Sequence, residues 1–100
     1  MSTNLKNQIF CMQASHEDDV EFYRVTRSTT NTCEVKKMKK NVIFQNENTQ
    51  YVEPDLESGG SKSRCRVISE IEIQFKSGEL GHLWDGKPVK QNAIIFMFPF

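Results

Sequence analysis

The stretch RVISEIEIQF, residues 66–75, decides the fold of this chain. Every second residue from Val67 to Phe75 is apolar except Ser69, and the residues between them are polar except Ile68. Successive side chains of a β-strand point to opposite faces of its sheet, so this alternation predicts a strand with one buried face.

Two segments upstream predict a β-hairpin. VEFYRVT (residues 20–26) and TCEVKKM (residues 32–38) are rich in β-branched and aromatic residues. Between them lies STTN (residues 28–31), which has the composition of a turn.

Shorter apolar segments predict further strands. They cover residues 7–13, 41–45 and 50–52, and Pro54 stops the last of them because proline has no N–H to donate. The sequence NAIIFMFPF at residues 92–100 is so apolar that we expect a buried final strand there.

One helix stays open as an alternative, because Ser15 and Asp18 have the spacing of a capping box before residues 17–25. ESGGSKS (residues 57–63) predicts a flexible loop. The sequence thus predicts an all-β fold, a single domain over residues 1–100 with at most one short helix. We expect a small barrel or sandwich of about five to seven short antiparallel strands, and a barrel of the Src-homology type fits this pattern.

Basic and acidic residues balance at thirteen each, so the chain has no net positive charge that would attract nucleic acid. The charges are nevertheless segregated. Residues 16–21 and 47–57 are acidic, whereas KKMKK (residues 36–40) and KSRCR (residues 62–66) are basic. Such runs are either solvated faces that keep the protein in solution or docking surfaces, and both interpretations remain open.

The cysteines argue against a metal site or a disulfide framework. Cys11, Cys33 and Cys65 are odd in number and far apart, and the chain has two histidines. We therefore expect no metal and no cofactor. Cys65 lies within the basic run at residues 62–66, and neighbouring positive charge favours the reactive thiolate.

Catalytic motifs are absent from the sequence, including G-x-S-x-G, a phosphate-binding glycine loop and H-E-x-x-H. Glu70 and Glu72 are expected about 7 Å apart on one strand face, where alternating glutamates are normal surface chemistry. We expect no signal segment, because the first residues lack a charged-then-apolar pattern with a small-residue cleavage site, and the sequence has no apolar run of the ~18 residues needed to span a bilayer. We expect a non-enzymatic protein of a reducing cytoplasm with no membrane contact.

GHLWDGKP, residues 81–88, holds the one tryptophan of the chain. Asp85-Gly86 is a strong turn signal, because glycine accepts a positive φ, and Pro88 stops the following ladder. We interpret the segment as a structural corner in which Trp84 covers the core beside the turn.

Two segments resemble a family of small proteins carried by bacteriophages and related mobile elements. The matching residues form a D-x-x-x-F-Y-x-V strand and a W-D-G-K-P segment, and they are Asp18, Phe22, Tyr23, Val25, Trp84, Asp85, Gly86, Lys87 and Pro88. Members of that family usually carry Trp-Gly-Tyr before the acidic residue, where this chain has Ala14, Ser15 and His16. The family has no settled activity, so the resemblance implies a genetic setting more than a mechanism.

Our first functional hypothesis is a protein-binding inhibitor of a bacterial defence system, such as CRISPR immunity or restriction. The resemblance implies the setting, and acidic strips can occupy positively charged nucleic-acid channels. The contacts with a host bacterial protein complex would be Glu17, Asp18, Asp19, Glu21, Glu53, Asp55 and Glu57.

The alternative is a small barrel that binds single-stranded nucleic acid through basic residues and an exposed aromatic ring. Its contacts would be Tyr23, Arg24, Arg27, Lys36, Lys37, Lys39 and Lys40. A third hypothesis is a homodimer or phage assembly component that uses the apolar tail as its interface.

Overall fold

The computed structural model describes residues 4–13, 20–47, 49–57 and 59–92, and every regular element in these ranges is a strand. The all-β prediction is confirmed. The nine strands are β1 (Ile9–Gln13), β2 (Val20–Ser28), β3 (Thr32–Met38), β4 (Lys40–Gln45), β5 (Thr49–Pro54), β6 (Lys62–Ser69), β7 (Glu72–Gln74), β8 (Leu80–Leu83) and β9 (Val89–Asn92).

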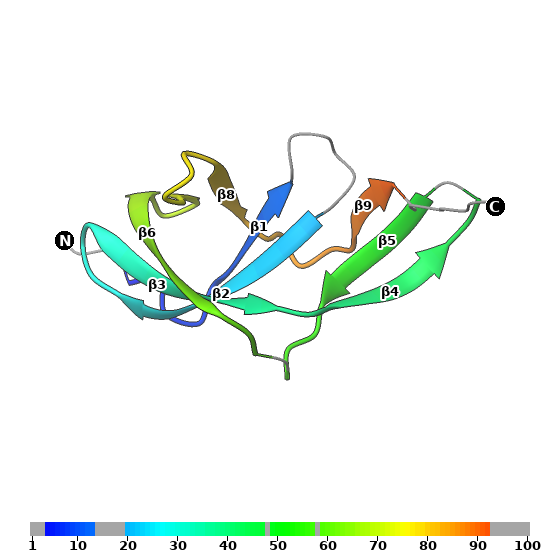
Figure 1. The fold of residues 1–100 in the computed structure, drawn as a ribbon, viewed down its shortest axis with the longest axis horizontal. Coiled ribbons are helices and arrows are strands. Elements are labelled where there is room, and N and C mark those ends of the chain that lie inside the picture. The colour runs from blue at the N-terminus through cyan, green and yellow to red at the C-terminus, as the bar shows by residue number, and fades with distance from the viewer. Residues whose placement is uncertain (1–3, 14–19, 48, 58, 93–100) are drawn as a thin grey trace.

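Six of these strands close into a barrel in the order β1-β2-β3-β6-β7-β8, and β8 pairs back onto β1. All the pairings are antiparallel. The six strands of the barrel agree with the predicted five to seven. The total is larger because β4, β5 and β9 form a second sheet, which extends beside the barrel in Figure 1.

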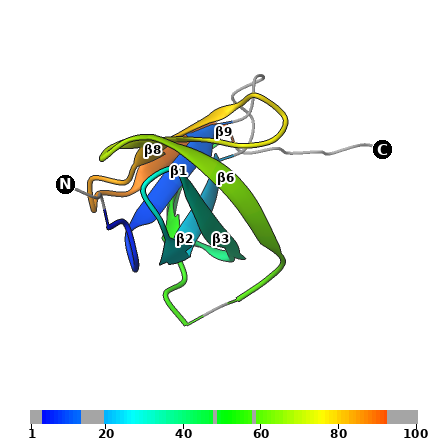
Figure 2. The same cartoon turned by 90° about the vertical axis from the view of Figure 1, so that its left-hand side faces the viewer.

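Strand β2 separates two hydrophobic cores. Its buried Tyr23 and Val25 point into the barrel, where β1, β2, β3, β6 and β8 surround the interior in Figure 2. Val20 and Phe22 point the other way and pack with Val52 of β5. Both faces of β2 therefore carry buried apolar side chains, four of them within the six residues 20–25.

The prediction of one continuous strand over residues 66–75 is wrong. A turn at residues 70–71 separates β6 from β7, and the Ile71 N–H donates a hydrogen bond of 3.2 Å to Ser69 Oγ. Ile71 is 61% exposed, so only part of the apolar set faces the core. Glu70 lies in the turn and therefore does not share a strand face with Glu72.

The hairpin of residues 20–38 is confirmed as β2 and β3, with a β-bulge between Val25 and Arg27. β5 extends through Pro54, which is the last residue of the ladder and lies opposite Lys40. The missing N–H of Pro54 does not interrupt the pairing, because the next N–H, that of Asp55, donates to the Lys39 carbonyl. β6 begins at Lys62, inside the segment predicted as a loop.

Other predictions fall partly or wholly outside the described residues. Of the alternative helix at residues 17–25, the described part, 20–25, is strand. The apolar tail is described only to residue 92, where β9 ends.

The segment GHLWDGKP is the predicted structural corner. Gly86 has a φ of 87°, and the Lys87 N–H donates to Asp85 Oδ1 at 2.9 Å. The Trp84 indole N–H donates to the Lys87 carbonyl at 2.7 Å, and its ring meets Phe22 edge-on at 5.8 Å between centroids. This arrangement ties the corner to the second core.

Candidate anion-binding face

The outer face of β2, β3 and β6 carries a cluster of basic side chains. Val25, Val35 and Cys65 are buried in the barrel, so the residues that alternate with them point outward. The strand register arranges the outward residues in three cross-strand rows: Arg24, Lys36 and Lys62; Arg27, Glu34 and Arg64; Thr32, Arg66 and Gln74. We call this surface the basic face.

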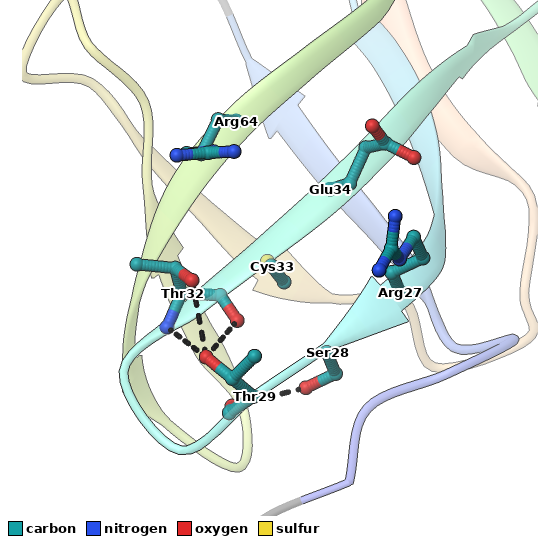
Figure 3. A pocket seen from close by; sticks show the side chains of 7 residues that line it. All are labelled: Arg27, Ser28, Thr29, Thr32, Cys33, Glu34 and Arg64. Atoms are coloured by element: carbon teal, nitrogen blue, oxygen red, sulfur yellow. Dashed lines mark hydrogen bonds between the residues drawn. The ribbon is translucent and has the colours of Figure 1, made fainter.

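A hollow of about 210 Å³ lies on the basic face beside the β2–β3 turn. Figure 3 shows Arg27 and Arg64 on either side of it, with the hydroxyls of Thr29 and Thr32 between the strands. The two threonine hydroxyls lie 3.0 Å apart, and Thr29 Oγ1 accepts the Thr32 N–H at 3.1 Å. Guanidinium groups beside hydroxyls form a favourable environment for an oxyanion such as a phosphate.

Glu34 is the one carboxylate in these rows, and its charge is already compensated. Its Oε1 accepts the Thr26 hydroxyl hydrogen bond at 2.9 Å and lies 3.9 Å from Lys62 Nζ. Ion pairs at a protein surface contribute little to stability, but this one reduces the repulsion that Glu34 exerts on an incoming anion.

A second hollow, of about 380 Å³, continues the basic face toward β7. Arg64, Arg66 and Lys76 line it together with the half-buried ring of Phe75. Arg64 lines both hollows, so the cations form a continuous path from the β2–β3 turn to the end of β7.

The structure brings three of the predicted nucleic-acid residues together and separates the rest. Arg24, Arg27 and Lys36 share the basic face. Lys37 points to the opposite side of β3, where its Nζ lies 3.0 Å from Glu21 Oε2. Lys39 and Lys40 lie at the junction of β3 and β4, and Lys40 Nζ donates to Gln91 Oε1 at 3.2 Å.

Tyr23 is not on the basic face. Its ring is 8% exposed inside the barrel and its hydroxyl donates to Glu21 Oε1 at 2.7 Å. Burial, and then the hydrogen bond to Glu21, raise the pKa of Tyr23 well above its ordinary value. A stacking role on a bound base is therefore excluded for Tyr23, whereas Phe75 packs against the barrel core and also lines the second hollow of the basic face.

Lys62, Arg64 and Arg66 belong to the basic face, although they are not among the site residues predicted from the sequence. The sequence does contain a signal for this placement, because the three cations occupy every second position and a strand presents such residues on one side.

The predicted acidic residues that the structure describes lie on β2, on β5 and in the segment that follows β5. Glu21 lies on the barrel side of β2, like Tyr23. Glu53 follows Val52 in β5, so the two side chains point to opposite faces of this strand. Val52 packs into the second core, and Glu53 therefore points away from that core. Asp55 and Glu57 are neighbours, since Asp55 Oδ1 accepts the Glu57 N–H at 3.0 Å. Residues 17–19 lie outside the described ranges.

The sequence leaves the reactivity of Cys65 open, and the structure places this thiol away from its basic neighbours. Cys33 and Cys65 face each other across β3 and β6, and both are buried in the barrel. The hydrogen bond to Cys33, and then burial, raise the pKa of the Cys65 thiol. The neighbouring cations point outward and so do not stabilise the thiolate. Burial raises the pKa of Cys11 to about 11, with a smaller effect of Asp85.

No three histidine, cysteine or acidic side chains are grouped to hold a metal ion anywhere in the described ranges. The described part of the chain contains no helix long and apolar enough to cross a membrane. No protein-family model, curated protein or solved structure gives a significant match to this chain.

Proposed function

We propose that this protein is a non-enzymatic binding module that holds the phosphate backbone of a single-stranded nucleic acid on its basic face. The observation that carries the proposal is the register, which places six cations and one compensated carboxylate on three adjacent strands.

The spacing of the rows supports this ligand. Rows of outward side chains on a strand repeat about every 7 Å, so successive rows meet successive parts of an extended chain. Arginine is suited to phosphate because its planar guanidinium donates two parallel hydrogen bonds. The two hollows beside Arg64 have room for the phosphate groups.

Phe75 supports a single strand over a duplex. It lines the second hollow beside Arg64 and Arg66. An aromatic ring next to cations is the combination with which proteins hold unpaired bases, because bases stack on the ring while phosphates meet the cations.

The salt dependence of binding tests this proposal. Single-strand binding with about five phosphate contacts predicts a slope of about −3.5 for log K against log salt concentration, hence an affinity loss of about a hundredfold between about 50 and 200 mM salt. The measurement is fluorescence anisotropy with a labelled poly-dT of about 15 nucleotides and with a matched duplex. A slope near zero, or an absence of binding at about 50 mM salt, would contradict the proposal.

A protein-binding inhibitor of bacterial defence, acting in the cytoplasm of the host cell, is a second candidate. It is favoured by apolar side chains exposed on the edge strand β4, namely Val42, Ile43 and Phe44. Adjacent exposed apolar residues on an edge strand are a typical protein contact. Recovery of one defence complex by the tagged protein from a nuclease-treated bacterial lysate, lost in an Ile43→Lys variant, is the expected result for this candidate.

A further inference from the structure

The barrel has an open seam between the first half of β6 and the β7–β8 turn. β6 pairs with β3 from Lys62 to Arg66 but with β7 only from Arg66 onward. A cavity of about 470 Å³ lies at this seam and opens into the barrel mouth.

The backbone of β6 is available at the seam. Alternate residues of a strand direct their N–H and C=O groups to opposite neighbours. The Ser61 carbonyl and the Val67 N–H both bond toward the β3 side, to Lys37 and Asn31. The backbone groups of Lys62 and Arg64 therefore point into the seam, where no described strand pairs with them.

The two sides of the seam differ in chemistry. Toward the barrel interior, Met12, Tyr23 and Phe75 provide an apolar floor, and the two aromatic rings lie 4.7 Å apart between centroids. Toward solvent, Lys62, Arg64 and Lys76 form a cationic rim, while Glu79 is the one carboxylate among the lining residues and accepts the Ser77 hydroxyl hydrogen bond at 3.1 Å.

We infer that the seam is a binding site for an extended acidic segment of a partner protein, which adds to the β6 edge as a short strand. Its backbone would bond to Lys62 and Arg64. Its side chains would alternate between apolar residues that enter the barrel mouth and acidic residues beside the rim, because neighbouring side chains of a strand point to opposite faces. Opposite charges on directly paired cross-strand residues stabilise such an addition.

The free backbone groups favour a peptide over a nucleotide as the occupant. Main-chain hydrogen bonds to a sheet edge supply affinity for a strand of any sequence, and the alternation of pockets and charges supplies selectivity. The seam shares Lys62, Arg64 and Phe75 with the surface proposed for nucleic acid. It differs in its use of the β6 backbone and of the inward-facing Ser63, so variants at Ser63 and backbone methylation of the peptide distinguish the two ligands.

The first experiment selects peptides of about ten residues from a random display library on the full chain, in the presence of nuclease. The expected result is enrichment of sequences that alternate acidic and apolar residues. Failure to enrich any sequence, or enrichment of basic or helical amphipathic ones, would overturn the inference.

The second experiment uses a labelled peptide of about ten residues that alternates aspartate and valine, with backbone N-methyl groups on one or the other set of alternate residues. Only every second N–H of an added strand faces β6, so one methylation pattern should weaken binding at least about tenfold and the other less than about threefold. Equal effects of the two patterns would overturn strand addition.

Charge reversal of the rim provides a matched comparison. The triple variant Lys62→Glu, Arg64→Glu and Lys76→Glu should lose at least about tenfold in affinity for the aspartate-valine peptide. The control reverses the exposed Lys6, Lys87 and Lys90, which lie outside the seam, and should change affinity by less than about twofold. Equal losses in the two variants would contradict a site at the rim.

A large side chain in the mouth of the barrel distinguishes a peptide ligand from a nucleic-acid ligand. Ser63 points toward the barrel mouth and is exposed, so Ser63→Phe should block entry of apolar side chains without disturbing the core. Peptide affinity should fall at least about tenfold while poly-dT affinity stays within about twofold. If poly-dT displaces the peptide and Ser63→Phe weakens both ligands equally, the mouth holds a nucleotide and the peptide inference is wrong.

Discussion

The two basic runs of this chain look alike in sequence and differ in space. In residues 62–66 the cations alternate with Ser63 and Cys65, and β6 presents all three cations on the basic face. In residues 36–40 the cations are mostly consecutive, so Lys36 points outward and Lys37 points to Glu21 on the other side. The spacing of charges relative to the two-residue period of a strand, and not their number, therefore decides whether they form a surface.

The two sides of β6 also differ, because its cations point outward and Cys65 points into the barrel. The largest expected effect concerns the alkylation rate of Cys65. Despite its basic neighbours, this thiol is buried and hydrogen-bonded to Cys33. Its alkylation by iodoacetamide in the native state should be slower than in denaturant by about a thousandfold, since reaction requires opening of the barrel. Mass spectrometry after timed quenching measures the rate.

The sign of the pH effect follows from the raised pKa of Cys65. A thiol whose pKa is higher in the folded than in the unfolded state stabilises the fold at pH values below the unfolded pKa, and this contribution is lost as the pH rises toward the folded value. Native Cys65 should therefore stay protected at pH 8. If native Cys65 were alkylated at pH 8 as fast as in denaturant, the thiol would be accessible and its basic neighbours could stabilise the thiolate.

Neutralising the two basic runs separately tests the comparison itself. The variant Lys62→Gln, Arg64→Gln, Arg66→Gln should bind poly-dT about a hundredfold more weakly at low salt, and the loss of three phosphate contacts should flatten the salt slope by about 2. The matched variant Lys37→Gln, Lys39→Gln, Lys40→Gln should lose less than about fivefold. Anisotropy titrations measure both, and similar losses would mean that net charge, not register, controls binding.

The smallest expected effect is a gain in affinity for poly-dT. Glu34 is the one carboxylate in the three rows of the basic face, and Glu34→Gln keeps an oxygen that can accept the Thr26 hydroxyl hydrogen bond. Poly-dT affinity should rise about two- to fivefold at low salt and the gain should vanish at high salt. A decrease in affinity would indicate that the Glu34–Lys62 pair positions Lys62 for binding.

The fold class and the central hairpin could be predicted from the sequence because β2 and β3 are rich in β-branched and aromatic residues and flank a segment of turn composition. The break at residues 70–71 could not, because Ile71 continues the apolar pattern although it is exposed in a turn. The strands at residues 41–45 and 50–52 were predicted, but their place in a second sheet was not, since Val42 and Phe44 look like core residues and are exposed at its edge.

The candidate site could be predicted only in part. Arg24, Arg27 and Lys36 follow from the hairpin, but their junction with Lys62 and Arg64 depends on the pairing of β3 with β6 across residues 39–61. Local sequence does not encode such a long-range register. Tyr23 was assigned to a surface because it neighbours basic residues, whereas β2 is buried on both faces and directs its ring inward.

The most direct test of the basic face is a two-dimensional NMR titration of the ¹⁵N-labelled full chain with poly-dT of about 15 nucleotides. If the register creates the site, the largest amide shifts are expected on Arg27–Thr32 and Arg64–Arg66, with small shifts at Lys37–Lys40. Shifts concentrated at Lys37–Lys40, or spread evenly over all lysines and arginines, would contradict the claim that strand register creates the site.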